Sequence, residues 1–191
     1  VEEKNDAFER IAASQRFRSA RRIDSSMFEY LSRWYHPVIR ELAARNDFRE
    51  DPEWIADKLR PRVPAEEVDK SLELLFDMGL LERDDEGNVS RGNPSLTTGH
   101  EVRSLAIGNY HRQMLERAEE SIESVDRELR DVSALTVCVE PEMVDELKER
   151  IHAFRETLLD LCDREEEPET VFQMNFQLFP LTEISDDENS E

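Results

Sequence analysis

Residues 51–90 read DPEWIADKLRPRVPAEEVDKSLELLFDMGLLERDDEGNVS, and this stretch decides the predicted fold. Asp51 and Pro52 have the composition of a helix start, in which an acid caps the first turn and proline follows it. A second apolar stripe at helical spacing ends at Gly79, where glycine suits a left-handed cap. An acidic turn at 84–88 between two short apolar arms then predicts a hairpin. Helix, turn, helix and hairpin in this order predict a winged helix-turn-helix.

The segment before this stretch adds one more helix. Apolar residues between Met27 and Ala44 recur at threes and fours, which predicts a helix over that range. Pro37 lies inside it and has no amide hydrogen to donate, so we expect a kink near Arg33 and Trp34. Together these elements predict a winged-helix-like unit over residues 25–92.

The helix that would have to enter DNA in such a unit is acidic. Against a single Lys70 it carries five carboxylates, namely Glu66, Glu67, Asp69, Glu73 and Asp77. Sequence-independent affinity for a duplex comes from lysine and arginine displacing counterions from phosphates. We therefore expect this helix to be repelled by DNA and its surface to hold protein instead.

The charge of the whole chain points the same way. With 46 Asp and Glu against 25 Lys and Arg, the formal net charge is −21, which is unusual for a free-standing nucleic-acid binder. A salt-adapted proteome would give the same composition. No apolar run approaches the roughly 18 residues that span a bilayer, and the start lacks the plan of a secretory signal. The sequence predicts a cytoplasmic protein without membrane contact, and a first residue Val1 suggests a fragment.

The C-terminal half is predicted to be a second unit, over residues 98–182. A long amphipathic helix is expected from His100 to about Arg130, followed by a strand, a helix and a strand. The strands are indicated by alternating apolar residues at 135–139 and 172–178. Residues 1–24 are predicted to be an N-terminal helix and linker, and residues 183–191 a disordered acidic tail. The fold class is therefore α+β and mostly helical.

Two strands alone are marginal in water, so this unit needs further strands from elsewhere. The hairpin of the first unit or a second copy of the chain could supply them. We favour a homodimer, because symmetric dimers are the commonest oligomers. The candidate contact residues are apolar positions on the long helix and the last strand: Leu115, Ile122, Phe172, Met174, Phe176 and Leu178.

The candidates for chemistry are few. Four histidines, at 36, 100, 111 and 152, have no partner at a diagnostic spacing, and no phosphate-binding glycine motif occurs. Cys138 and Cys162 suit small buried thiols better than a disulfide or a zinc site. The sequence therefore predicts no enzyme, no cofactor and no metal. An effector or partner pocket, or else ordinary interhelical packing, is expected around Trp34, Tyr35, His36, Tyr110 and His111.

Several short motifs resemble a known family. They occur in the same order over about residues 25 to 182: Trp34-Tyr35-His36, Ile39-Arg40-Glu41-Leu42, Asp51-Pro52-Glu53-Trp54-Ile55-Ala56, Met78-Gly79-Leu80-Leu81, Asn109-Tyr110-His111-Arg112-Gln113-Met114 and Phe176-Gln177-Leu178-Phe179-Pro180-Leu181-Thr182. The chain resembles the C-terminal domain of an uncharacterised bacterial family of predicted transcription regulators. The resemblance implies that DNA is contacted by an N-terminal lambda-repressor-like helix-turn-helix, which this chain lacks.

The predicted function follows from the resemblance and the charge together. We expect a regulatory and dimerisation region of a bacterial transcription regulator, which is not itself the main DNA-contacting part and whose effector is unknown. The alternative is a protein-interaction adaptor that uses a winged helix as its docking surface and never binds DNA.

Overall fold

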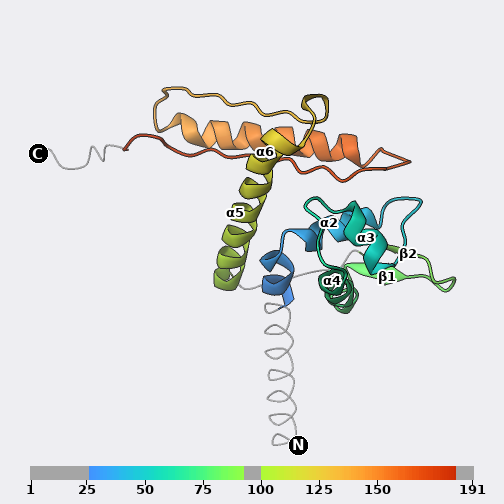
Figure 1. Ribbon diagram of the computed structural model, residues 1–191. Helices are drawn as coiled ribbons and strands as arrows, with labels where there is room; N and C mark the ends of the chain where they lie inside the picture. The colour runs from blue at the N-terminus through green and yellow to red at the C-terminus, as the bar shows by residue number, and fades with distance from the viewer. Residues whose placement is uncertain (1–25, 93–99, 184–191) are drawn as a thin grey trace, which may run out of the picture. The chain divides into compact units, whose positions relative to one another are not determined.

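The computed structural model describes residues 26–92 and 100–183 (Figure 1). The described part is α+β and mostly helical, as predicted. Residues 26–32 are helical, and the other elements follow in this order: α2 (Tyr35–Leu42), α3 (Pro52–Lys58), α4 (Ala65–Asp77), β1 (Leu81–Arg83), β2 (Val89–Arg91), α5 (His100–Ser124), a 3-10 turn (Arg127–Leu129) and α6 (Met143–Cys162). The predicted N-terminal linker, the boundary before residue 98 and nearly all of the predicted tail lie outside the described residues.

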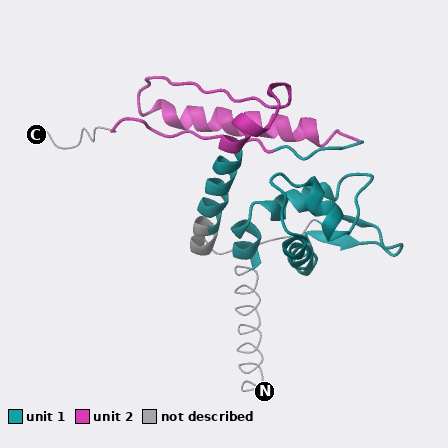
Figure 2. Ribbon diagram, in the orientation of Figure 1, with its two compact units in different colours: residues 1–117, 167–172 teal, residues 118–166, 173–191 magenta. Residues whose placement is uncertain are grey.

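The chain divides into two compact units, coloured separately in Figure 2. Unit 1 comprises residues 1–117 and 167–172, and unit 2 comprises residues 118–166 and 173–191. The division falls within α5, so this helix contributes to both units.

The core of unit 1 lies between α2, α3, α4 and the hairpin. Five large apolar side chains there are almost fully buried, namely Ile39, Ile55, Val68, Leu75 and Leu81. Burying each contributes about 1.5–3 kcal/mol to folding. Val171, from the short segment 167–172, packs against the same core. Segments far apart in the sequence thus share one apolar cluster.

The predicted helix signals of residues 51–79 are confirmed. The Asp51 carboxylate accepts hydrogen bonds from the backbone amides of Glu53 and Trp54, at 2.9 and 3.2 Å, and Pro52 begins α3. These bonds satisfy two amides that a helix start leaves without partners. At the end of α4, Gly79 has φ of 68°, the left-handed conformation that glycine adopts without a steric penalty.

The predicted hairpin is also present. Strands β1 and β2 are antiparallel, with Leu81 opposite Arg91 and Arg83 opposite Val89. Asp84 donates its backbone amide to the carbonyl of Asn88 at 3.0 Å, and the turn between them contains Gly87 with φ of 86°. A positive φ at this point lets the chain reverse within few residues.

The first predicted helix is broken rather than merely kinked. Residues 26–32 are helical, the helix is interrupted at Arg33 and Trp34, and α2 begins at Tyr35. The break lies where Pro37 predicts it, because proline cannot donate to the carbonyl four residues earlier.

Helix α5 ends at Ser124, six residues before the predicted end. The hydroxyls of Ser121 and Ser124 bond the carbonyls of Ala118 and Glu120, at 2.6 and 2.7 Å. Side-chain bonds of this kind compete with the helical pattern, and Asp126 then adopts an extended ψ of 140°. The serines and the aspartate therefore account for the earlier end.

The two strands predicted in the C-terminal half do not form. Helix α6 is present as expected, but residues 131–140 and 170–180 are neither helix nor strand. A strand is defined by its hydrogen-bonded neighbour, and the described part of this chain offers these segments none. The apolar side chains of α6 are at most half-buried, and no side chain in residues 118–183 is buried. Cys138 and Cys162, expected to be buried, are exposed free thiols.

Candidate functional site

The exposed face of α4 is acidic, as its sequence predicts. Glu66, Asp69, Glu73 and Asp77 are exposed and Glu67 is half-buried. The ammonium Nζ of Lys70 lies 3.0 Å from carboxylate oxygens of both Glu66 and Glu67. These two bonds raise the pKa of Lys70 above its usual value. The single cation of the helix is therefore neutralised within the helix itself.

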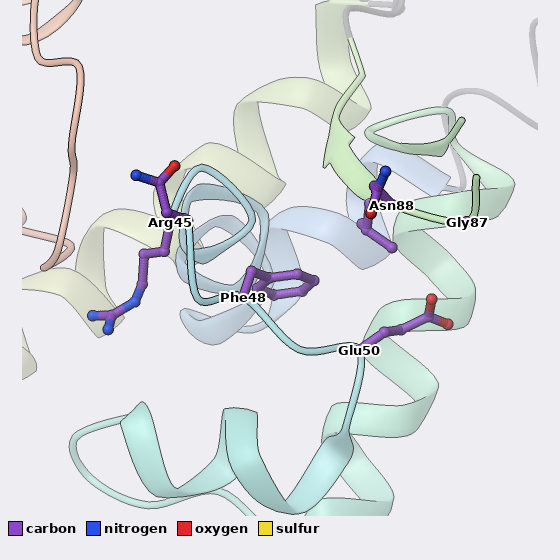
Figure 3. A pocket seen from close by; sticks show the side chains of 7 residues that line it. Arg45, Phe48, Glu50, Gly87 and Asn88 are labelled. Carbon is purple, nitrogen blue, oxygen red and sulfur yellow. The ribbon is translucent and has the colours of Figure 1, made fainter. Parts of the chain in front are cut away.

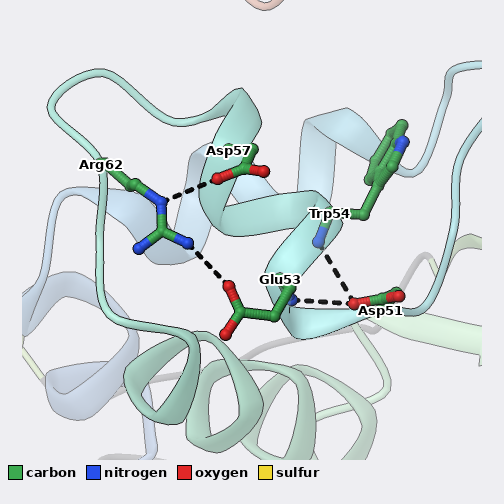
Figure 4. A network of polar contacts seen from close by, with 5 residues as sticks. All are labelled: Asp51, Glu53, Trp54, Asp57 and Arg62. Atoms are coloured by element: carbon green, nitrogen blue, oxygen red, sulfur yellow. Dashed lines mark hydrogen bonds and ion pairs between the residues drawn. The ribbon is translucent and has the colours of Figure 1, made fainter.

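The arginine that follows α3 is neutralised in the same way (Figure 4). The guanidinium of Arg62 donates to Asp57 through Nε and to Glu53 through Nη2, both at 2.7 Å. The bond to Asp57 contributes most to raising the pKa of Arg62. Because both acceptors lie on α3, Arg62 ties the turn before α4 back to the preceding helix.

Several other cations near the hairpin also contact carboxylates or rings. Arg83 binds Glu50 and lies 3.8 Å above the centroid of the Phe76 ring. Arg91 donates to Glu41 at 2.6 Å, and the ammonium of Lys58 lies 5.2 Å from the centroid of the Trp54 ring. Arg45 donates to Asp47 at 2.7 and 2.9 Å. Each of these four cations therefore has an acidic or aromatic partner.

Two side-chain amides of α5 form hydrogen bonds with the backbone at the break between residues 26–32 and α2. The side chain of Gln113 accepts from the backbone amide of Trp34 at 3.0 Å and donates to the carbonyl of Ser32 at 2.8 Å. Asn109, one turn earlier on α5, donates to the same carbonyl at 3.2 Å. Arg117 lies over the Trp34 ring, 5.5 Å from its centroid. The backbone groups freed by the break are thus paired with side chains of α5.

The residues after the break face α4. The Tyr35 hydroxyl donates to Glu67 at 3.1 Å, and Nδ1 of His36 lies 2.7 Å from the Ser71 hydroxyl. Burial, together with the nearby charge of Arg33, lowers the pKa of His36 to about 4. Burial and the bond to Glu67 raise the pKa of Tyr35. Near neutral pH the imidazole and the phenol are therefore uncharged.

The five predicted pocket residues come from two segments, the start of α2 and the middle of α5. Trp34, Tyr35 and His36 are adjacent at the start of α2, with ring centroids 5.9 and 4.8 Å apart. Tyr110 is half-buried on α5, and burial raises its pKa. His111 is exposed and lies 6.0 Å from Tyr110. The interhelical hydrogen bonds near His111 are made by its neighbours Asn109 and Gln113.

A small hollow that the sequence did not suggest lies between the hairpin turn and the loop after α2 (Figure 3). Its volume is about 220 Å³, and its lining residues are Arg45, Asn46, Phe48, Glu50, Gly87, Asn88 and Val89. Several of its polar groups already have partners, because Glu50 binds Arg83 and the Asn88 amide donates to Asp84 at 2.9 Å. No local pattern could have predicted it, since its two sides lie about 40 residues apart.

The predicted subunit-contact residues are all exposed. The set comprises Leu115, Ile122, Phe172, Met174, Phe176 and Leu178. In unit 2, the rings of Phe154 on α6 and Phe176 meet edge to face, with centroids 6.0 Å apart. Across the described residues no group of three histidine, cysteine or acidic side chains could hold a metal ion. Likewise, no helix in the described ranges is long and apolar enough to cross a membrane.

A family model described as "Domain of unknown function (DUF4423)" matches residues 14–181. The chain belongs to the DUF4423 family. Comparisons with curated proteins and with solved structures give no match. The DUF4423 match includes the acidic α4, the broken first helix and α6. The match also includes residues 170–180, so this segment is part of the family domain.

Proposed function

We propose that this DUF4423 chain is a regulatory, protein-contacting region of a bacterial transcription regulator and does not itself hold DNA. The observation that supports the absence of DNA binding is the charge of α4. Four of its carboxylates are exposed, and Lys70, the only cation in the sequence of α4, is bonded to Glu66 and Glu67. The proposed regulatory role rests on the resemblance of the sequence motifs to predicted regulators.

The order of elements in unit 1 supports a winged-helix-like arrangement. Three helices, α2 to α4, precede the β1–β2 hairpin, and α4 stands where such a unit has its recognition helix. A recognition helix in a major groove must approach two rows of phosphates closely. With Glu66, Asp69 and Glu73 exposed on α4, that approach would bring like charges together and release no counterions from the duplex.

A direct test is a fluorescence titration of the intact chain with a labelled duplex at low salt. We expect no binding at micromolar protein, because the acidic face repels phosphates. Salt-sensitive binding with submicromolar affinity would refute this part of the proposal. The matched variant is Glu66→Lys/Asp69→Lys/Glu73→Lys, which should acquire weak, salt-sensitive binding if α4 is sterically able to reach a duplex.

A second candidate function is that of a protein-interaction adaptor that does not bind DNA. The observation that favours it is the same exposed row of carboxylates on α4, which suits a basic protein surface. The two candidates differ in what precedes Val1 in the gene. A basic helix-turn-helix encoded there supports the regulator, and an unrelated domain supports the adaptor.

A further inference from the structure

Unit 2 differs from unit 1 in that none of its described side chains is buried. In unit 1, the side chains of Ile39, Ile55 and Leu75 are completely shielded from solvent. In residues 118–166 and 173–183, every described side chain is at least partly exposed. Ordering a chain costs conformational entropy at every residue, and the burial of apolar surface is the main term that offsets this cost. Unit 2 therefore has too little burial to be stable by itself.

The apolar side chains of unit 2 are exposed along two segments on either side of α6 in the sequence. Figure 1 shows residues 131–140, in gold, and residues 173–180, in red, running along this helix. The rings of Phe176 and Phe154 meet on α6, yet Phe176 remains 39% exposed. The exposed fractions range from 39 to 86% for six side chains: Leu135, Val137, Val139, Met174, Phe176 and Leu178. Exposed apolar surface of this extent is typical of a contact with another protein.

The amount of exposed apolar surface matches a complete interface. Together with Phe179 and Leu181, these six side chains expose roughly 900 Å². Each partner in an interface of standard size contributes about 800 Å². Unit 2 therefore exposes enough apolar surface for one interface with a partner that carries a similar surface.

The charge of the two segments favours a second copy of the chain as that partner. Residues 132–139 and 173–182 contain no charged side chain, although 37% of the residues of the chain are charged and its net charge is −21. Two copies of such an acidic chain repel each other, so they can meet closely only where both are uncharged. A basic partner would instead be bound by carboxylates, and these two segments have none.

We propose that unit 2 becomes stable only by association with unit 2 of a second copy of this chain, and that the contact buries the apolar side chains of residues 132–139 and 173–182. This inference rests on the proposal that the chain is a protein-contacting region, and it names the partner. Subunits that complete each other's core have no stable folded monomer, so their stability depends on protein concentration. Unit 1 has its own core and does not depend on association.

Sedimentation equilibrium of the intact chain, combined with far-ultraviolet circular dichroism, tests the partner. We expect a dimer at tens of micromolar. A monomer in which α6 is helical would mean that unit 2 is stable without a second copy. A monomer in which α6 is not helical would mean that a different protein covers unit 2. Either monomer overturns the inference.

Urea unfolding can follow the two units separately. Both tryptophans, Trp34 and Trp54, lie in unit 1, so tryptophan fluorescence reports on unit 1 alone. Circular dichroism also reports on the 20 residues of α6 in unit 2. Raising the protein concentration about a hundredfold should move the unfolding midpoint of unit 2 up by about 1 M urea and leave that of unit 1 unchanged. A midpoint of unit 2 that does not move overturns the coupling of folding to association.

The variant Leu135→Lys/Leu178→Lys tests whether the two segments form the contact. Lysine makes the acidic chain less negative, which by itself favours association, but its burial in an apolar interface is unfavourable. We expect the Kd of the dimer to rise at least about tenfold, and the helical signal of α6 to fall with the dimer. Unchanged tryptophan fluorescence would show that unit 1 remains folded in the variant.

The matched control is Asn46→Lys/Ser90→Lys, which makes the same change of charge at two exposed positions of unit 1. It should not raise the Kd. An unchanged Kd in the Leu135→Lys/Leu178→Lys variant overturns the proposed contact, and so does a monomeric variant that keeps α6 helical. None of these measurements involves DNA, so their failure would leave the charge argument for α4 intact.

Discussion

Nδ1 of His36 on α2 lies 2.7 Å from the hydroxyl oxygen of Ser71 on α4, and both side chains are buried. The pair joins two helices across the core of unit 1 by a polar contact. A buried imidazole is stable there only when it is uncharged, since the site offers a hydroxyl and no carboxylate at hydrogen-bond distance from the ring. Glu67 nearby favours the charged form, but its effect is smaller than those of burial and Arg33.

The first prediction concerns pH. Burial lowers the pKa of His36 to about 4 in the folded chain, against an ordinary value of 6.5. The unfolded chain therefore takes up a proton before the folded chain does as the pH falls. The resulting stabilisation is fully present above pH 6.5 and is lost as the pH falls towards 4. The difference in unfolding free energy attributable to His36 is about 3 kcal/mol.

Urea unfolding at pH 7.5 and pH 4.5 measures this effect. His36→Asn retains a group that can bond Ser71 but cannot take up a proton, so its stability should fall less between the two pH values than that of the wild type. His111→Asn, at an exposed position on α5, is the control and should behave as the wild type does. Equal pH dependence in all three proteins would contradict the assignment.

The second prediction concerns the start of α3. Asp51→Ala removes the acceptor for the amides of Glu53 and Trp54, which should cost about 1 kcal/mol of unfolding free energy. Thermal or urea unfolding measures the loss. Asp51→Asn keeps an oxygen at the same place and should recover most of the stability. If asparagine were as harmful as alanine, the negative charge and not the cap would be the stabilising feature.

Signals confined to a few neighbouring residues were predictable from the sequence. Asp51 and Pro52 begin a helix, Gly79 ends one, and Pro37 interrupts one, because each effect acts through the backbone of its own turn. The acidity of α4 was also predictable, because charge needs no geometry. The fold class could be inferred because it follows from these local helix and turn signals.

Features that depend on distant segments were not predictable. Gln113 binds the helix break across 79 positions of sequence, and no periodicity reveals such a partner. The hollow beside Asn88 likewise joins separate loops. Alternation at 172–178 predicted a strand with one buried face, but its apolar side chains are exposed and a strand also requires a hydrogen-bonded neighbour. The described chain provides none, so the pattern alone overestimated the regular structure.

The third prediction tests the hydrogen bonds that Gln113 and Asn109 of α5 make with the backbone at the helix break. Gln113→Ala leaves the Trp34 amide without its acceptor, while Asn109 still donates to the Ser32 carbonyl. A half-buried donor that loses its partner costs about 1–3 kcal/mol, and we expect a loss in that range on urea unfolding. Glu116→Ala, at an exposed position of the same helix, should change stability by less than about 0.5 kcal/mol. If Gln113→Ala and Glu116→Ala lowered the stability equally, the hydrogen bond from Trp34 to Gln113 would not stabilise the break.

Adding Asn109→Ala to Gln113→Ala should cost more than the two single losses together. Either amide alone can still donate to the Ser32 carbonyl, whereas the double variant leaves that carbonyl without both donors. Simple additivity would show that the two amides act independently.

The last prediction compares one substitution at two glycines. A Cβ atom at Gly92 would lie 2.0 Å from the carbonyl oxygen of Gly79, so the backbone would have to move. Gly92 cannot easily shift, because its amide donates to the Leu80 carbonyl at 2.9 Å and its carbonyl accepts from Arg40 at 3.1 Å. Gly92→Ala should therefore lower the unfolding free energy by at least about 2 kcal/mol.

Gly108→Ala should have the opposite sign. A Cβ atom there meets nothing within 4 Å, and the residue lies inside α5. Alanine is favoured over glycine in a helix by about 1 kcal/mol, because glycine loses more backbone freedom on folding. Urea unfolding of both variants beside the wild type should place Gly108→Ala above it and Gly92→Ala below it. If both variants were destabilised equally, the close approach of Gly92 to Gly79 could not be the cause, since only one of the two sites is crowded.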